Sequence, residues 1–472
     1  MKYSIRSTAT VAMALAVMSG LIVVGPAGAA TVKAGAKCTK VGEVKSGLIC
    51  KQVGNKRTYQ KQAVAPTTAA ASTGAATPAP AVGLAAARGF DGKTIKVGYV
   101  GQVATNPAFP SSPLFAEGGA ALTAGFNAYM SRVNDAGGIA GKYPVEVLFK
   151  DAFYDAAESV KKYTELKDDV VMLGQIYGTP GTQALRDALK RDNMIASPIS
   201  LDAEWVTGEN FLPIGTTYQA HAINLSDWYI KEGGGATKTL CSLSIAPNPY
   251  GVALEEGYDF AAKKLGFKNG GKFRYTTADA TAQQLKDAKC EAVVTAISGE
   301  AHTSPLLGAG EKIGYFPTYL GASPTFSSRR VTSANSKLYT DQVIIAGDGA
   351  QWGDTAIPGM KDFLADMSKY APQLIGAPNP AAVWGYVQAR TVVAMLTNAV
   401  KLGDLSPAGM KAAMSSLGKV SYDGLFPDWN YVAPAQRVAP AIVHIARADV
   451  SVRGGLQDIK IFESAAAKEY RR

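Results

Sequence analysis

One segment of the chain alternates helix and strand signals in an order that restricts the fold. Residues 126–133 carry apolar side chains at helical spacing, and the glycines within 134–142 end that helix. A strand at 144–151, a helix at 156–167 and an apolar strand at 170–176 follow. Strands that alternate with helices form a parallel sheet, which binds ligands in the loops beyond the carboxyl ends of its strands. The segment therefore predicts an α/β fold with a ligand-binding loop after the last of these strands.

The same alternation occurs twice from about residue 90 onwards. The first half also has strands at 94–101 and 196–200. The second half has its own series of strands and helices: strands at 239–245, 273–277, 291–297 and 318–320, and a helix at 253–265. Two halves of similar size predict two Rossmann-like lobes with a cleft between them, where small-molecule sites tend to lie. Closure of two lobes around a ligand is an established hinge motion.

The amino end predicts export. Lys2 and Arg6 precede an apolar run at 12–24, and Ala27 and Ala29 form a small-residue cleavage site, so residues 1–29 are interpreted as a signal peptide. A retained membrane anchor is the alternative, although the apolar run is shorter than the roughly 20 residues that a spanning helix needs. A lipoprotein is less favoured, because Lys37 directly precedes Cys38, where a lipid-attachment site would have a small residue. We expect the mature chain to be secreted, in the cell envelope or extracellular.

Two further segments precede the large part of the chain. Residues 30–62 are basic and contain Cys38 and Cys50, which predicts two short strands joined by one disulfide. Metal binding is the competing use, but two sulfurs with no neighbouring histidine make a poor zinc site. The cysteine, lysine and glycine spacing resembles a small module of actinobacterial envelope proteins. Residues 63–89 are rich in Ala, Thr and Pro and predict an extended linker.

The other two cysteines leave two alternatives open. Cys241 and Cys290 lie at or near apolar strands that could be adjacent, so a disulfide and two buried free thiols are both consistent with the sequence.

Composition and motifs exclude other classes of function. The net charge of +10 comes from scattered Lys and Arg, without the aromatic and basic interleaving that binds nucleic acid. The three histidines, His221, His302 and His444, lie far apart, and no phosphate loop, dinucleotide fingerprint or nucleophile elbow is present. We therefore expect no enzymatic activity, no cofactor, no metal site and no nucleic-acid partner.

Between residues 94 and 450 the chain resembles the leucine/isoleucine/valine-binding branch of the substrate-binding proteins of ABC transporters. The resemblance rests on the order and spacing of several short features: 137–141, Asp151, Gly174, Ser197–Pro198, Tyr250–Gly251, Asp279, Ala282–Gln283 and Trp384 to Tyr386. It implies a type I periplasmic-binding-protein fold whose lobes are joined by three crossings, near 213–218, 344–349 and 437–441. Lobe 1 would comprise 90–217 and 348–438, and lobe 2 would comprise 218–347 and 439–472.

The resemblance also implies a binding site. Gly178, Thr179 and Thr182 fall where the family binds a ligand carboxylate, and Ser197 and Ser200 fall where it receives the amino group. The second lobe would contribute Tyr250 and Glu300, and Trp384 would line the side-chain pocket.

Each of these residues also has an ordinary structural interpretation. Thr179 and Thr182 are typical helix-capping residues, Ser197 followed by Pro198 is typical of a strand end, and Tyr250 and Trp384 could be packed in the core. Glu300 could be solvated, as loop glutamates usually are.

One departure from the family pattern bears on the ligand. Amino-acid-binding members have an acidic residue in the loop after the fourth strand of the second lobe, whereas 321–325 has none. Either Glu300 or Asp348 replaces it, or the ligand is not an α-amino acid, since an unpaired buried ammonium is costly. Leu201 also replaces a common hydroxyl residue.

The leading hypothesis is an extracellular protein that captures a small polar organic ligand, such as a branched-chain amino acid, an amide or a related compound, for an ABC permease. The alternatives are a ligand-sensing receptor of the same fold, and an envelope protein whose amino-terminal module contacts the cell wall.

Overall fold

The computed structural model describes two parts of the chain, residues 33–61 with gaps at 34, 42, 46, 47 and 54, and residues 84–472 without 246 and 332–334. They belong to two separate compact units, 1–80 and 81–472. The predicted signal peptide at 1–29 and residues 63–83 of the predicted linker lie outside the described residues. Among the residues that are described, no helix is long and apolar enough to cross a bilayer.

The small unit is an antiparallel sheet of three short strands, β1 (Val44–Lys45), β2 (Leu48–Val53) and β3 (Lys56–Lys61). Cys50 on β2 lies opposite Tyr59 on β3, and both side chains are buried. A disulfide joins Cys50 to Cys38, with the Cα atoms 5.9 Å apart, so the predicted bond is present. A unit of this size buries little apolar surface, and the disulfide adds stability that its core does not supply.

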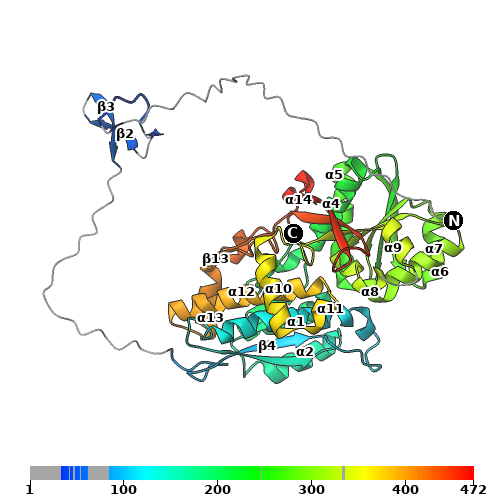
Figure 1. Cartoon of the computed structure of the whole chain (residues 1–472), viewed down its shortest axis with the longest axis horizontal. Coiled ribbons are helices and arrows are strands. Elements are labelled where there is room, and N and C mark those ends of the chain that lie inside the picture. The colour runs from blue at the N-terminus through cyan, green and yellow to red at the C-terminus, as the bar shows by residue number, and fades with distance from the viewer. Residues whose placement is uncertain are drawn as a thin grey trace, which may run out of the picture. The chain divides into compact units, whose positions relative to one another are not determined.

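The large unit has two lobes, each built on its own sheet (Figure 1). The lobe 1 sheet has the strand order β5-β4-β6-β7 and is parallel throughout. Its strands are β4 (Ile95–Gly101), β5 (Val145–Asp151), β6 (Met172–Tyr177) and β7 (Ala196–Ile199). The helices that contact it are α1 (Ala116–Asp135), α2 (Ala156–Leu166), α3 (Thr179–Arg191) and α12 (Ala381–Leu402).

Successive residues of β4 pack on opposite faces of this sheet, which explains its almost unbroken apolar sequence. Val97 and Tyr99 belong to the core that includes α1 and α12, while Val100 belongs to the core under α2 and α3. Strands that are buried on both faces require apolar side chains at nearly every position.

Helices α1 and α12 approach each other closely, because glycines lie at their contact. A methyl group on Gly125 would overlap the carbonyl oxygen of Ala382, and one on Gly385 would overlap that of Leu122. Both positions therefore require glycine, which has no side chain. The close contact lets α12 pack on lobe 1 although α12 follows lobe 2 in the sequence.

The lobe 2 sheet has the strand order β16-β15-β12-β11-β10-β8-β9, in which β15 runs antiparallel to both of its neighbours and the other described pairs are parallel. Its strands are β8 (Thr239–Ile245), β9 (Lys268–Tyr275), β10 (Ala292–Ala296), β11 (Thr318–Ala322), β12 (Val343–Gly347), β15 (Val443–Ala448) and β16 (Leu456–Phe462). Helices α4 (Tyr218–Lys231) and α5 (Pro249–Leu265) share the core on one face, and α6 (Ala278–Asp287), α7 (Ser304–Lys312) and α9 (Ser336–Gln342) share the other. Strand β15 joins this sheet after the third crossing, and β16 adds an edge strand that the sequence pattern did not indicate.

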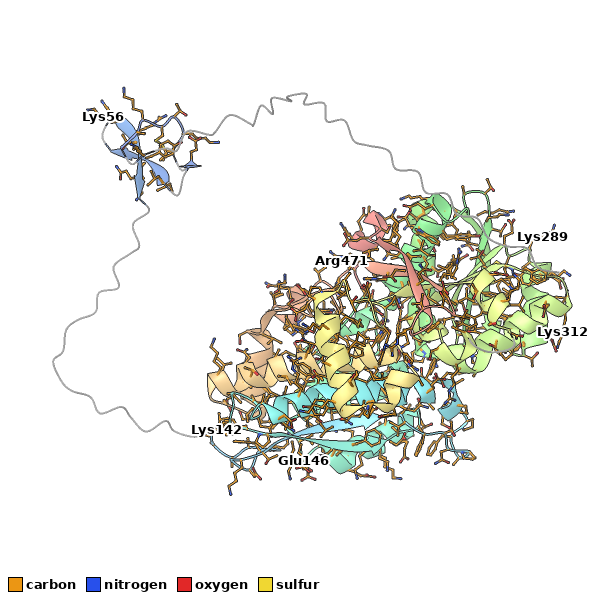
Figure 2. The ribbon with its side chains drawn as sticks, in the orientation of Figure 1. Lys56, Lys142, Glu146, Lys289, Lys312 and Arg471 are labelled. Atoms are coloured by element: carbon orange, nitrogen blue, oxygen red, sulfur yellow. A yellow bond between two sulfur atoms is a disulfide. The ribbon has the colours of Figure 1, made fainter. Side chains whose placement is uncertain are left out.

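The remaining elements are short or lie at the periphery: η1 (Ser112–Leu114), η2 (Ala203–Trp205), η3 (Gly299–Thr303, a π-helical turn), η4 (Ser323–Thr325), α8 (Ser328–Val331), α10 (Pro358–Tyr370), α11 (Gln373–Gly376), α13 (Pro407–Ser415), β13 (Gly418–Val420), β14 (Trp429–Tyr431), η5 (Pro434–Gln436) and α14 (Ala465–Glu469). The side chains of Lys142 and Glu146 lie at the outer edge of lobe 1, and those of Lys289 and Lys312 at the outer edge of lobe 2 (Figure 2).

The chain passes between the sheets three times, after β7, after β12 and between β14 and β15. Hydrogen bonds join these passages. The amide N–H of Thr216 donates to Asp348 Oδ1 over 2.9 Å, and its hydroxyl donates to the carbonyl oxygen of Ile442 over 2.6 Å. The three crossings therefore form one connected hinge.

Cys241 and Cys290 form a disulfide, with the Cα atoms 5.7 Å apart. Cys241 on β8 is paired with Val293 on the adjacent parallel strand β10, and Cys290 lies just before that strand. Both cysteines are buried in lobe 2. The alternative of two free thiols is thus excluded.

Candidate functional site

A cavity lies between the two lobes, beyond the carboxyl ends of the strands of both sheets. Its free space is about 1060 Å³ when the open solvent at its mouth is included, so the enclosed part is smaller. Lobe 1 contributes residues that follow β6 and that begin α1 and α12, and lobe 2 contributes the start of α5 and the turns after β10 and β11.

Eight aromatic side chains from both lobes line the cavity: Phe115, Tyr154, Tyr177, Tyr218, Tyr250, Phe326, Trp384 and Phe426. They pack on one another. The ring centroids of Tyr218 and Tyr250 lie 4.6 Å apart, and those of Phe115 and Tyr154 lie 4.8 Å apart. The rings of Trp384 and Phe426 meet edge to face, with their centroids 5.6 Å apart. A wall of this kind favours a ligand with a flat or flexible apolar body.

The positions of these aromatic residues follow from the fold. Tyr177 is the last residue of β6, and Tyr218 is the first residue of α4. Tyr250 lies in the first turn of α5, where the Asn248 side chain caps the helix by accepting from the Tyr250 amide over 3.0 Å. Strand ends and helix starts meet at one edge of an α/β sheet, so all three rings reach the same space.

Gly178 is the member of the predicted carboxylate-binding loop that lines the cavity. Its φ of +78° is in the left-handed region, and a methyl group there would overlap the ring of Tyr154. A glycine is therefore required for the chain to turn from β6 into α3 beneath that ring.

The four hydroxyl residues predicted at the site do not line the cavity. Thr182 donates its hydroxyl to the Gly178 carbonyl oxygen over 2.8 Å, and Ser197 donates to the Leu212 carbonyl oxygen over 3.0 Å. Ser200 donates to the Thr179 hydroxyl over 2.8 Å.

These four side chains are fully buried, and their hydrogen bonds hold the start of α3 and the strand β7 in place. None of the four side chains therefore lines the cavity, and α3 begins without a side-chain cap, so the capping alternative for Thr179 and Thr182 is not seen either. The Thr182 and Ser197 hydroxyls satisfy backbone carbonyl groups instead.

Tyr250 and Trp384 do line the cavity. Tyr250 is only 1% exposed, and its hydroxyl is near the Thr325 side chain without a well-formed hydrogen bond among the described residues. A buried hydroxyl without a partner costs free energy. A ligand oxygen that accepted from it would remove that cost.

Glu300 also lines the cavity and is largely buried, which contradicts the solvated interpretation. Its Oε1 accepts from the Gly118 amide over 2.9 Å, and its Oε2 accepts from the Glu117 amide over 3.1 Å. Burial raises the pKa of Glu300 to about 7 against the lowering effect of these two amides, and the nearby Glu117 carboxylate raises it further.

Asp348 lines the cavity at the second crossing and is 1% exposed. Its Oδ1 accepts from the Thr216 amide and lies 3.0 Å from His221 Nε2, while its Oδ2 accepts from the Ser323 hydroxyl over 3.2 Å. Both carboxylates considered as partners of a ligand ammonium are thus already hydrogen-bonded to the protein.

No Lys, Arg or His is among the described residues that line the cavity. Nor does any group of three or more His, Cys, Asp or Glu side chains within the described parts of the chain have the arrangement to hold a metal ion. The polar groups of the cavity are hydroxyls, amides and three carboxylates, Glu117, Glu300 and Asp348.

Sequence reasoning missed most of the aromatic wall. The sequence offered one signal for three of them, because a residue just after a predicted strand lies at the ligand-binding edge of the sheet. Those three are Tyr154, Tyr177 and Tyr218. Phe326 and Phe426 lie in irregular segments far apart in the sequence, and no local pattern connects them.

A family model described as periplasmic binding protein matches residues 94–451. The chain belongs to the periplasmic binding proteins. This membership and the two-lobed architecture confirm the predicted type I fold and the predicted role as a solute-binding protein. The family is one of extracellular or periplasmic proteins that bind solutes. A search of curated proteins found no match.

Solved structures of transporter binding proteins share the fold. A fatty acid ABC transporter substrate-binding protein from Thermomonospora curvata is 24% identical, with a TM-score of 0.75 over 82% of this chain and 97% of that chain. A solute-binding protein from R. palustris in complex with 4-hydroxybenzoate is 18% identical, with a TM-score of 0.65 over 79% and 97%. A branched-chain amino acid ABC transporter protein from Thermus thermophilus with bound valine is 16% identical, with a TM-score of 0.63 over 80% and 98%.

Proposed function

We propose that this periplasmic binding protein captures a small organic solute with an apolar alkyl or aromatic body and one oxygen-bearing end, such as a carboxylic acid, and delivers it to an ABC permease. The observation that carries the proposal is the wall of aromatic side chains contributed by both lobes. Closing such a wall around a solute removes its apolar surface from water, at about 25 cal/mol per Å².

Hydroxyl groups are the natural partners of the oxygen-bearing end. The Tyr250 hydroxyl is buried in the described part of the chain without a well-formed hydrogen bond, and Tyr218 lines the same cavity. Both are neutral donors, so they suit a carboxyl, carbonyl or amide oxygen equally. Trp384 and Phe426 would cover the apolar body, and Gly178 leaves room for Tyr154 at its side.

An α-amino acid fits these residues less well. Its ammonium would need a carboxylate, and the oxygens of Glu300 and Asp348 already accept hydrogen bonds from the protein. The loop 321–325 offers no other acid. Burying an ammonium without a dedicated partner is costly.

The names of two structural relatives support the same class. One is a fatty acid transporter protein, and another carries 4-hydroxybenzoate. The relative with bound valine is the counterexample, which makes branched-chain amino acids the necessary comparison in any screen.

A thermal-shift screen of the purified protein tests the proposal. It compares benzoate, 4-hydroxybenzoate, octanoate and benzamide with leucine, valine and isoleucine at the same concentrations. A solute present at 100 times its Kd stabilises the folded protein by about 2.7 kcal/mol. A dose-dependent rise in Tm with at least one acid or its amide supports the proposal, and a rise with amino acids alone contradicts it.

Export and envelope attachment belong to the same proposal. We propose that residues 1–29 direct export, that residues 63–89 are a tether, and that the disulfide-linked unit at 30–62 contacts the cell wall. The basic composition of that unit supports attraction to an anionic polymer. Deleting residues 30–62 is expected to release the protein from the envelope fraction into the medium, and unchanged retention would contradict this role.

Binding without catalysis completes the proposal. The cavity contains no histidine or lysine among its described lining residues, so a general base would have to be a carboxylate. We expect each bound compound to be recovered unchanged after prolonged incubation with the protein.

A further inference from the structure

The lining of the interlobe cavity combines aromatic rings with acidic groups and lacks basic ones. Glu117, Glu300 and Asp348 contribute carboxyl groups, and no Lys, Arg or His is found among the described residues of the lining. Such a lining opposes a solute whose only charge is negative, because like charges repel more strongly where water is excluded. A solute that also carries a positive charge in its body avoids this repulsion.

Asp348 is the most deeply buried of the three acids, at 1% exposed. Its oxygens contact the Thr216 amide, the Ser323 hydroxyl and the His221 imidazole, and no lysine or arginine of the described chain pairs with it. An ammonium with N–H groups would compete with these partners for the same two oxygens. A cation without N–H groups needs no acceptor and is attracted by the charge of the carboxylate alone.

Aromatic rings lie on two sides of Asp348. The glycine that follows Asp348 packs on Phe426, since a methyl group on it would lie 2.7 Å from a ring carbon. The Phe426 ring in turn meets the Trp384 ring at 5.6 Å between centroids. On the other side, the ring of His221 bonds to Asp348 and lies 6.2 Å from that of Tyr218. The carboxylate thus lies between two parts of the aromatic wall.

Aromatic rings attract cations through their faces, which carry partial negative charge. A cation within about 6 Å of a ring centroid is stabilised in this way, and tryptophan attracts it most strongly. A quaternary ammonium group suits such rings, because its methyl groups bury apolar surface and leave no N–H donor unpaired. The cost that disfavours a primary ammonium in this cavity therefore does not apply to it in the same measure.

We propose that the solute carries a quaternary ammonium group, held against Trp384 and Phe426 beside Asp348. The inference rests on the proposed function and narrows its solute to betaines and choline-like compounds, in which an alkyl or aromatic body bears a trimethylammonium group as well as the oxygen-bearing end. A betaine has no net charge, so its carboxylate enters the acidic cavity together with a compensating cation.

Isosteric pairs test the role of the positive charge. In each pair a trimethylammonium group is compared with a tert-butyl group of the same shape: 4-trimethylammoniobutyrate with 5,5-dimethylhexanoate, 4-(trimethylammonio)benzoate with 4-tert-butylbenzoate, and choline with 3,3-dimethylbutan-1-ol. Titration calorimetry on the full-length natural protein gives the Kd of each compound. Shape and apolar area are nearly equal within a pair, so the ratio of the two Kd values reports the charge.

The cationic member of at least one pair is expected to bind about tenfold or more tightly than its partner, as a desolvated contact between a cation and aromatic rings provides. A preference below tenfold in all three pairs, or no binding of any cationic member, would overturn the inference. Binding of the tert-butyl acids without their cationic partners would do so while leaving the proposed function intact. Failure of the proposed function itself is shown separately, by a thermal-shift screen in which only amino acids bind.

Trp384→Leu tests where the cation lies, because leucine keeps an apolar side chain but has no ring face. The preference for the cationic member is expected to fall below about threefold in this variant. Phe316→Leu makes a similar change at a ring that is 58% exposed and outside the cavity, and it is expected to keep the full preference. An undiminished preference in Trp384→Leu would contradict the placement, and the pairs measured on the natural protein decide the inference even where this variant fails to fold.

Discussion

The imidazole Nε2 of His221 lies 3.0 Å from Oδ1 of Asp348, and both side chains are fully buried at the hinge. His221 belongs to α4 of lobe 2, and Asp348 follows β12 where the chain crosses to lobe 1. The same carboxylate accepts from the Thr216 amide of the first crossing. One side chain therefore connects two of the three passages between the lobes.

Asp348→Asn is expected to destabilise the protein by about 1–3 kcal/mol, because charge-assisted hydrogen bonds to the hinge become neutral ones and the Ser323 hydroxyl loses its carboxylate acceptor. Urea denaturation measures the change. Asp168→Asn, at a carboxylate that is 80% exposed, is the matched control and is expected to change stability by less than about 0.5 kcal/mol. Equal midpoints for the two variants would contradict the structural role of Asp348.

Removing the lobe 2 disulfide is expected to lower the stability of the large unit substantially. Cys241 and Cys290 are separated by 49 residues, and a loop of that length corresponds to about 4 kcal/mol of chain entropy. The double variant Cys241→Ala, Cys290→Ala is measured by calorimetry.

The Cys38→Ala, Cys50→Ala protein is the control, because that bond lies in the separate amino-terminal unit. The large unit of this control is expected to have the same Tm as in the natural protein. A similar loss of Tm in both double variants would contradict the independence of the units.

The contact between α1 and α12 leaves no room for a side chain at Gly125. A methyl group there would overlap the Ala382 carbonyl oxygen, so Gly125→Ala is expected to cost about 1–3 kcal/mol, the range typical of overpacking. Gly376→Ala is the control, since no atom lies near the added methyl group. Thermal unfolding gives the Tm of both variants. A Gly125→Ala protein as stable as the Gly376→Ala control would contradict the close contact between α1 and α12.

The cavity residues are expected to affect binding rather than folding. Tyr250→Phe removes one hydroxyl and is expected to weaken binding of the best acid from the screen about three- to tenfold, the value of one neutral hydrogen bond. Trp384→Ala is expected to weaken it more, because a large part of the apolar wall is lost. Titration calorimetry gives both Kd values.

Thr182→Ser serves as a control for these two variants, because its hydroxyl bonds to the Gly178 carbonyl oxygen and does not line the cavity. It is expected to leave the Kd unchanged. An effect of Thr182→Ser on the Kd as large as that of Tyr250→Phe would contradict the placement of Thr182 outside the cavity.

The fold was predictable because its main signals are local. The apolar strand that became β6 and the glycines that end α1 are visible within short windows of sequence. The edge strand β16 was not predicted: Ile459 and Ile461 are exposed, so the strand lacks the buried alternation by which strands are recognised.

The site was less predictable, because a hydroxyl group at a strand or helix end can bind a ligand or can hydrogen-bond to the protein itself. The sequence does not distinguish these two uses. Ser197 and Thr182 donate to backbone carbonyl groups of lobe 1, a use that neither the family positions nor the capping alternative predicted. Tyr250 was predicted from the resemblance to the family, and it lines the cavity. Glu300 contacts a helix that precedes it by more than 180 residues, and no local pattern encodes such a contact between lobes.

A crystal structure of the protein grown with the acid that raises its Tm most is the most direct test of the central claim. The proposal predicts that the solute lies between the lobes, with its apolar body against Trp384 and its oxygen-bearing end within hydrogen-bond distance of Tyr218 or Tyr250. An empty interlobe cavity with the acid bound elsewhere, or an α-amino acid in its place, would contradict it.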